Sequence, residues 1–199
     1  MRTHIVNGTV FSPAAAAGLT LGLAVALAPA AASAAIVTVD ATTSGAYNAS
    51  GQRASLTENF LTGQLGQVER RSFLAFDLSG IAGTVTSAKL RLFNPRELPL
   101  LGYVSPDESE TLAFWDVTTL AASFLDGSAG LDGFADLGSG TLFGTRSVSA
   151  ADNGTVIEID LNAAALAALT AAAGGEFVIG GALTSLSGTT DQYVFGFTM

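Results

Sequence analysis

Apolar and polar positions alternate most clearly in two stretches of the chain. From residue 87 to 93, Ala88, Leu90 and Leu92 alternate with serine, lysine, arginine and phenylalanine. From 155 to 161, isoleucine and leucine alternate with valine, glutamate and aspartate. A period of two is typical of a strand with one face in the core and one in water. Both stretches are therefore predicted to be half-buried strands.

The stretch from residue 71 to 78 precedes the first of these strands and is apolar on both faces. Leu74 and Phe76 would share one face, and Phe73 and Ala75 the other. Apolar side chains on both faces are typical of a strand in the centre of a sheet. The Gly- and Thr-rich connection after it is too long for a tight hairpin, so we expect it to cross between two sheets.

The rest of the chain has the pattern of short strands separated by turns. Further strands are predicted at 36–39, 110–116, 141–148, 176–183 and 192–197, with weaker strand character around 54–60. Residues 41–66 otherwise have the composition of loops, as do residues 126–140. Three prolines between 95 and 106 predict an irregular excursion, because proline cannot donate to a strand ladder.

Two segments favour helix over strand. Residues 117–125 can form a short helix that leads into the glycine-rich loop. Residues 163–173 are rich in alanine and leucine, with Asn162 as an N-cap and Gly174 after the end. Many short strands with one short embedded helix near 163–173 predict an all-β fold, specifically a jelly-roll-like β-sandwich.

The first 34 residues have the features of an export signal. Arg2 supplies a positive start, and no charge follows until after Val39. The small-residue run that ends at Ala34 matches an A-x-A cleavage site, so we expect cutting after this residue. A retained membrane anchor is disfavoured because the segment is mostly alanine and is interrupted by proline. The remaining residues 35–199 then form a single domain that is secreted or at the cell surface, with no stable membrane insertion.

Composition narrows the chemistry of this domain. The chain has a formal net charge of −9 and loses one further positive charge with Arg2, so nucleic acid and anionic membranes are disfavoured partners. It contains no cysteine, and its single histidine, His4, lies in the predicted signal. Thiol and zinc-thiolate chemistry and a Ser-His pair are therefore excluded for the cleaved protein. The oligomeric state is left open.

The two organising strands and their linker, RSFLAFDLSGIAGTVTSAKLRLFN, resemble the core motif of DNRLRE-type carbohydrate-binding modules. The matching residues are Phe73, Phe76, Asp77, Leu78, Ser79, Thr86, Ala88, Leu90 and Leu92. The resemblance covers about an eighth of the chain and consists mostly of predicted core positions. It implies a β-sandwich and a non-catalytic role in binding carbohydrate.

The wider pattern is similar to exported bacterial proteins that carry a PEP-CTERM sorting tail. The similarity lies in ADLGSGTLFGTRSVSAADNGT, the alanine-rich helix and GGALTSLSGTTDQYVFGF. The sequence ends at Met199 without the Pro-Glu-Pro motif, the apolar helix and the basic end of such a tail. Two interpretations stay open: the tail has been lost, or the protein is a freely secreted relative. Either implies an extracellular place among exopolysaccharide.

Cations concentrate on the organising strands of an otherwise acidic chain. The residues that could bind an acidic polysaccharide are Arg71, Lys89, Arg91 and Arg96, with Tyr103 and Trp115 as flat faces for sugar rings. Arginine forks match carboxylates and sulfates bidentately. The alternative is that these cations form ordinary surface ion pairs with nearby acids, which contribute little energy.

Carboxylates suggest two further sites. Glu158 and Asp160 would share one strand face at a spacing that a glycosidase pair could use, but acids on a solvated outer face are the more common explanation. Asp126, Asp132 and Asp136 lie in a glycine-rich stretch that could hold a structural calcium, against the alternative of plain turn residues. No catalytic residue and no other cofactor is predicted. We therefore rank a non-catalytic glycan-binding or matrix protein first, a purely structural or self-associating surface protein second, and a glycosidase or polysaccharide lyase third.

Overall fold

A computed structural model of the chain describes residues 4–8, 35–54, 60–96, 102–188 and 190–196. The described structure is mostly β, as the alternation predicts. Its strands are β1 (His4–Gly8), β2 (Ala35–Asn48), β3 (Phe60–Leu65), β4 (Val68–Asp77), β5 (Lys89–Asn94), β6 (Gly102–Val104), β7 (Glu110–Asp116), β8 (Leu142–Val148), β9 (Thr155–Asp160), β10 (Glu176–Leu183) and β11 (Gln192–Gly196). Its helices are α1 (Ala121–Asp126), α2 (Gly130–Asp136) and α3 (Ala163–Ala171), with a 3₁₀ turn η1 (Ala150–Asp152).

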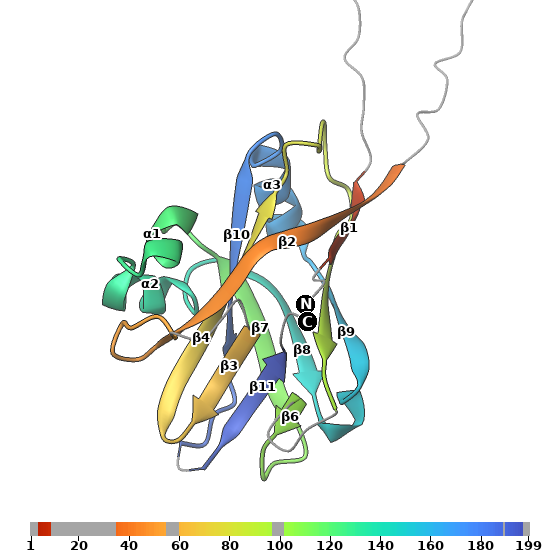
Figure 1. The fold of residues 1–199 in the computed structure, drawn as a ribbon. Coiled ribbons are helices and arrows are strands. Elements are labelled where there is room, and N and C mark those ends of the chain that lie inside the picture. The colour runs from red at the N-terminus through yellow and green to blue at the C-terminus, as the bar shows by residue number, and fades with distance from the viewer. Residues whose placement is uncertain (1–3, 9–34, 55–59, 97–101, 189, 197–199) are drawn as a thin grey trace, which may run out of the picture.

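Seven antiparallel strands form one curled sheet (Figure 1): β6, β11, β3 and β4 pair in that order, β10 pairs with β4 and β7, and β7 pairs with β8. The strand β4 lies in the middle. β2 pairs along one of its edges, and β3 and β10 share the other edge, β3 at residues 68–70 and β10 at residues 72–77. Residues 72–76 are all buried, which confirms the prediction that this segment is a central strand.

The strands β5 and β9 pair with each other and form a second, two-stranded sheet. The linker between β4 and β5 passes from the large sheet to the small one, so the prediction of a crossing connection is confirmed. The strand β1 joins the two parts at one end. It pairs with residues 35–40 of β2 on one edge and with residues 89–91 of β5 on the other.

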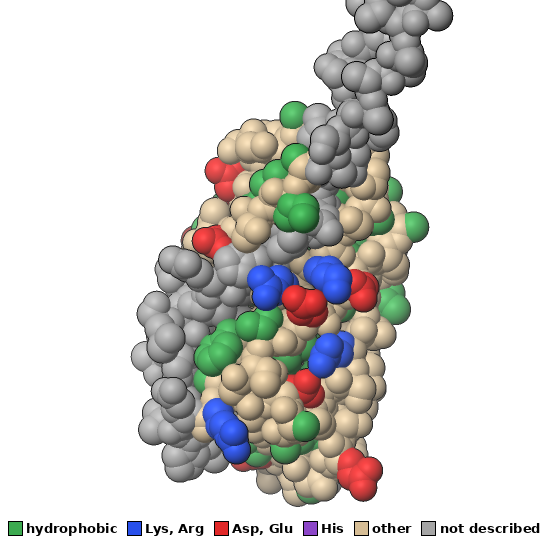
Figure 2. All heavy atoms as spheres, turned by 90° about the vertical axis from the view of Figure 1, so that its right-hand side faces the viewer, with side chains coloured by type: hydrophobic (Ala, Val, Ile, Leu, Met, Phe, Trp, Pro, Cys, Tyr) green, Lys and Arg blue, Asp and Glu red, His purple; other side chains and the backbone are tan. Residues whose placement is uncertain are grey.

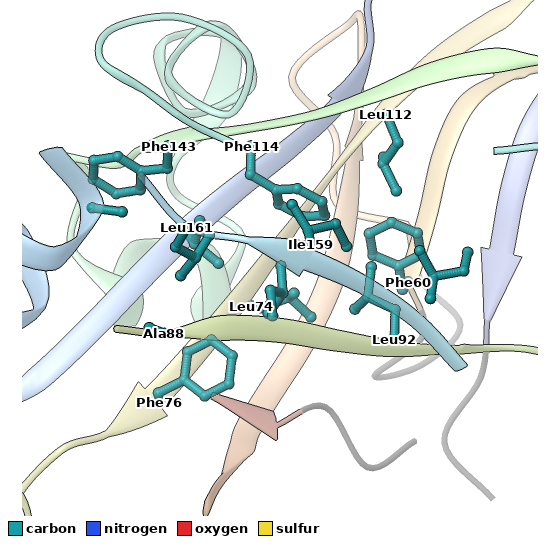
Figure 3. Close-up of a cluster of buried hydrophobic side chains, with 14 of the residues drawn as sticks. Phe60, Leu74, Phe76, Ala88, Leu92, Leu112, Phe114, Phe143, Ile159 and Leu161 are labelled. Carbon is teal, nitrogen blue, oxygen red and sulfur yellow. The ribbon is translucent and has the colours of Figure 1, made fainter. Parts of the chain in front are cut away.

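The main core lies between the curled sheet and the β5–β9 pair (Figure 3). Leu90 and Leu92 of β5 are 0% and 1% exposed, and Ile157 and Ile159 of β9 are 0% and 1% exposed. They pack against aromatic and aliphatic side chains of β3, β4, β7 and β8. The inward faces predicted from the alternation are therefore confirmed for both strands.

A second, smaller core covers the opposite face of β4. It consists of Tyr47, Phe73, Phe124, Ala129 and Leu137. The rings of Phe73 and Phe124 stack with their centroids 5.0 Å apart. These side chains come from β2, β4 and the α1–α2 segment, which lies on the outer side of the sheet in Figure 1. This cluster explains why β4 is apolar on both faces.

The helix α2 falls in residues 126–140, where the sequence predicts a loop, so that prediction is wrong. Gly130 and Gly133 lower the intrinsic helix propensity of this segment, which is why its composition indicates a loop. Packing on the sheet favours the helix instead, because Leu137 at its C-terminal end is fully buried against β10. A Cβ at Gly180 of β10 would lie 2.7 Å from the Cα of Leu137, so this contact requires glycine.

The predictions for the other helices hold better. The helix α1 begins four residues later and ends one residue later than the short helix predicted at 117–125. The helix α3 is the embedded helix of the prediction, and the side chain of Asn162 accepts a hydrogen bond from the N–H of Ala165 at 3.1 Å. The all-β prediction with one helix thus becomes a mostly β structure with three α-helices among the described residues.

Two loop predictions also need correction. The first strand does not end at Val39, because β2 continues through Asn48, where serine, glycine and alanine pair with β4. The proline-rich excursion contains the short strand β6, which pairs with β11. The weak strand at 54–60 lies mostly outside the described residues, and so does most of the predicted signal, apart from β1. No helix in the described parts of the chain is long and apolar enough to span a membrane.

Candidate functional site: the outer face of β5 and β9

Charged side chains form a ladder on the solvent side of the small sheet. The register places Lys89 directly opposite Asp160 and Arg91 directly opposite Glu158. Because Leu90 and Ile159 point into the core, their neighbours along each strand point outward. Figure 2 shows cations and acids interleaved on the side of the molecule where β5 and β9 lie. We call these four residues the charge ladder.

The charge ladder is a connected set of ion pairs. Lys89 Nζ lies 3.2 Å from Glu158 Oε2 and 3.4 Å from Asp160 Oδ1, and Arg91 Nε lies 3.0 Å from Glu158 Oε1. The hydrogen bond to Glu158 and the charge of Asp160 raise the pKa of Lys89 above its ordinary value. All four side chains are substantially exposed, from 37% for Arg91 to 84% for Asp160. The Lys89 side chain is therefore accessible to a ligand, and so is part of the Arg91 side chain, whose Nε is buried. The charge of both cations is balanced by acids.

A third cation lies beside β9 and was missed by the sequence analysis. Arg146 of β8 donates from Nη1 to the carbonyl oxygen of Glu158 at 3.2 Å. Its Nη2 lies 2.9 Å from Asp152 Oδ1, in an ion pair. No local pattern marks Arg146 as part of this surface, because β8 belongs to the large sheet and β9 to the small one. Here too a carboxylate offsets the added charge.

The charge ladder continues into an apolar pair at its other end. Phe93 is paired with Val156 in the same register, and the two side chains are 36% and 45% exposed. The outer face of β5 and β9 thus presents three consecutive cross-strand pairs, of which two are charged and one is apolar. Such a surface suits a sugar, because an exposed aromatic ring can contact the apolar face of the sugar while neighbouring charged side chains contact its hydroxyl or acid groups.

Arg71 does not join this face. It lies on β4, and its side chain is on the same side of the large sheet as Phe73, toward α2. Its Nε is 2.9 Å from Glu69 Oε1, and its guanidinium carbon is 4.3 Å from the centroid of the Phe134 ring. The β5 strand lies across the main core from this position. Arg71, which was predicted to bind the same ligand as Lys89 and Arg91, therefore lies on a different surface.

The two proposed sugar platforms are also placed elsewhere. Tyr103 is 6% exposed and its hydroxyl donates to the Asp107 carbonyl at 2.7 Å, so it offers no free ring face. Trp115 is half-buried on β7 and alternates with Phe114, whose ring fills the main core. Its side chain therefore points away from the core and from β5. Arg96 is exposed just after β5, where its side chain packs over Gly154.

Two of the three aspartates considered for calcium accept hydrogen bonds from backbone N–H groups. Asp126 accepts a hydrogen bond from the N–H of Ser128 at 2.8 Å, and its hydrogen bonds with Ser128 lower the pKa of its carboxyl group. Asp136 accepts from the N–H groups of Thr118 and Thr119 at 2.9 and 2.7 Å. Asp132 is an exposed residue in the first turn of α2. Within the described ranges, no group of three or more His, Cys, Asp or Glu side chains could hold a metal ion.

A buried polar cluster lies where β6, β7 and β11 meet. Glu110 is 1% exposed. Its carboxylate accepts from Ser105 Oγ at 2.7 Å, from Gln192 Nε2 at 2.8 Å and from Ser185 Oγ. Gln192 also donates to Asp107 at 2.8 Å. These hydrogen bonds tie the segments after β6, at the start of β7 and at β11 together.

The carboxylate pair considered for glycoside hydrolysis is part of the charge ladder. Glu158 and Asp160 are held by Lys89 and Arg91 on an exposed strand face, so neither faces a partner carboxylate across a cleft. A scan against models of protein families gave no match for this chain, and a search of curated proteins gave none either. The charge ladder and its apolar end are thus the surface that the geometry singles out.

Proposed function

We propose that this chain is an exported, non-catalytic protein of the cell surface or extracellular matrix, and that the charge ladder makes weak contact with acidic polysaccharide. The observation that carries the proposal is the placement of Lys89 and Arg91 side by side on one exposed face of an otherwise acidic molecule. The signal-like residues 1–34 support export. The resemblance to carbohydrate-binding modules supports the class of ligand.

The ion pairs within the charge ladder limit how strongly a polyanion can bind. A glycan carboxylate or sulfate must compete with Glu158 and Asp160 for the same cations. Exposed ion pairs contribute only about 0.2–1 kcal/mol each, so exchanging one acid for another is nearly neutral. Affinity for a long polymer then arises from many repeats along many copies of the protein. Phe93 and Val156 add apolar contact at the end of the face.

Two double variants with opposite expected effects test this proposal. The first, Lys89→Gln with Arg91→Gln, removes the cations, and the second, Glu158→Gln with Asp160→Gln, removes the competing acids. Both variants break the same ion pairs, so any loss of stability from breaking them is common to both. A difference in binding between the two variants then comes from the charges that remain. Retardation is measured by native gel electrophoresis in soluble acidic polysaccharides, with neutral polysaccharides for comparison.

We expect the cation-free variant to lose retardation in acidic polysaccharide and the acid-free variant to be retarded more than the parent. Binding should weaken between low and physiological salt, where the screening length falls to about 8 Å. Equal retardation of the two variants, or a preference of the parent for neutral glycans at every salt concentration, would contradict the proposal. The purely structural interpretation would then stand first.

For the fold, we propose the jelly-roll-like form of a β-sandwich. The β5–β9 sheet packs face to face with the curled sheet over one core, which is the layer arrangement of a sandwich. The linker that crosses from β4 to β5 supports this reading, since jelly rolls use connections between sheets rather than successive hairpins. An experimental structure of the cleaved protein, with the strand order read directly, tests it.

A further inference from the structure

The strand β1 occupies a place between two edges that have no other partner among the described strands. Its residues pair with Thr38, Val39 and Asp40 of β2 and with Lys89, Leu90 and Arg91 of β5. Among the described strands, the backbone of residues 35–40 forms a ladder with β1 only, because the ladder of β2 with β4 begins at Ala41. We call residues 35–40 the arm, and the place of β1 beside β5 the slot.

Cleavage after Ala34 removes β1 and leaves the arm at the new N-terminus. The strand β2 begins at Ala35, the first residue of the cleaved chain. Both the arm and the edge of β5 then present unpaired backbone N–H and C=O groups, which template pairing with another strand. The arm has the sequence AIVTVD, rich in the β-branched residues that favour strands, and Ile36 is 73% exposed. Figure 1 shows that this end of β2 extends beyond the body of the domain.

We infer that the cleaved chain forms a two-fold symmetric dimer in which each copy inserts its arm into the slot of the other. The inference rests on the export and cleavage proposed above. The strand order across the interface would be β5, partner arm, own arm, partner β5. Each arm then lies between two strands, and every edge that β1 covered is covered again. The same surface is used by both copies, so the assembly closes at two.

The geometry favours a second copy over the arm of the same chain. Since β1 is antiparallel to both β2 and β5, the arm and β5 run parallel to each other. Removing β1 leaves them two strand spacings apart, about 9–10 Å. Closing this gap within one chain would displace the arm and form a parallel ladder, which is slightly less stable per residue. A partner arm fills the gap in the antiparallel orientation of β1 without moving either edge.

Charge distinguishes this association from binding of a polyanion. Two strongly acidic copies repel each other, and salt screens that repulsion. Pairing through backbone groups does not depend on the charge ladder. Dimerisation should therefore strengthen with salt, whereas the binding of acidic polysaccharide should weaken.

The first experiment uses protein collected after export from cells that express the full chain. Its N-terminus is identified by mass spectrometry and its molar mass in solution by light scattering during size exclusion. We expect a start at Ala35 and a dimer. A start at Met1 overturns the export proposal and this inference together, since β1 then keeps the slot. A start at Ala35 with a monomer at all salt concentrations overturns this inference alone.

The second experiment locates the contact and exploits the absence of native cysteine. Thr38→Cys is made in one preparation and Lys89→Cys in another. With the two arms paired symmetrically about Thr38, the partner's Thr38 takes the position of Val6, which β1 pairs with both Thr38 and Lys89. After mixing, a short bifunctional thiol reagent should join the two variants into covalent heterodimers. As a control, Thr38→Cys is mixed with Ser139→Cys, an exposed residue on the α2 side. Equal yields from both mixtures would overturn the exchange of arms.

Discussion

Among single residues, Glu110 shows how this acidic chain keeps one carboxylate inside the molecule. A buried charge is costly unless hydrogen bonds replace its lost hydration. Ser105, Ser185 and Gln192 supply these bonds, and Gln192 is in turn held by Ser187 through its amide oxygen at 2.9 Å. In a chain without disulfides, such a cluster fixes loops that packing alone does not reach.

The first prediction concerns this cluster. We expect Glu110→Ala to lower the free energy of unfolding by about 2–4 kcal/mol, because it leaves several buried donors without an acceptor. Chemical denaturation followed by circular dichroism measures the change. Glu108→Ala is the matched control, since Glu108 is an exposed acid two positions away and its loss should change stability by no more than about 0.5 kcal/mol. Similar values for the two variants would show that the carboxylate of Glu110 is dispensable.

Among the elements, β5 and β9 show how far alternation alone determines structure. Their inward and outward faces follow the period of two, from Leu90 and Ile159 inside to Lys89 and Asp160 outside, except at the start of β9, where Thr155 has the inward parity but is exposed. Short strands with this pattern need no further information, because a shift by one residue would expose every apolar side chain.

Replacing a core residue of β5 tests that assignment. We expect Leu90→Ala to cost about 2–4 kcal/mol of stability, from lost burial and the cavity that remains. Val156→Ala, on the outward face of the neighbouring strand, should change stability by less than about 1 kcal/mol because Val156 is 45% exposed. The shift in the denaturation midpoint measures both. If Val156→Ala proved the more costly change, the two faces would have been assigned in reverse.

The same elements show where prediction from sequence fails. The helix α2 was missed because it depends on contacts with β10, which its own glycine-containing sequence does not reveal. The patch of cations was only partly correct, since the placement of Arg71 depends on which face of β4 it shares and on the helices that cover that face. The partners of Lys89 and Arg91 depend on the pairing of β5 with β9, which joins strands far apart in the sequence.

At the scale of the whole molecule, all three tyrosines of the chain are buried. Their ionisation can therefore be used to monitor whether the fold is intact. Tyr47 and Tyr193 are 0% and 1% exposed, and Tyr103 is 6% exposed. Burial raises the pKa of each phenol above its ordinary value. They lie in the second core, at β11 and at β6, so they sample both faces and the far edge of the curled sheet.

The alkaline titration of these phenols gives a further prediction. A folded pKa above the unfolded value of about 10 means that the folded state holds its protons more tightly. The corresponding stability is present below pH 10 or so and is lost as the pH rises through the folded pKa values. We expect phenolate absorbance to appear at higher pH in the native protein than in guanidinium, and to coincide with loss of β structure. Titration at the same pH in both solvents would show that the phenols are open to water.

The position of β4 in the sheet has a consequence for the order of events in folding. One edge of β4 is completed by β2, which precedes it closely, but the other edge is completed by β10, near the opposite end of the chain. Contacts between segments so distant in sequence form slowly, because the entropy cost of closing a long loop comes before the contacts can stabilise the fold. The central sheet therefore cannot close until nearly the whole polypeptide is available. If the chain is exported as proposed, this delay would keep it extended during synthesis and leave its folding to the far side of the membrane.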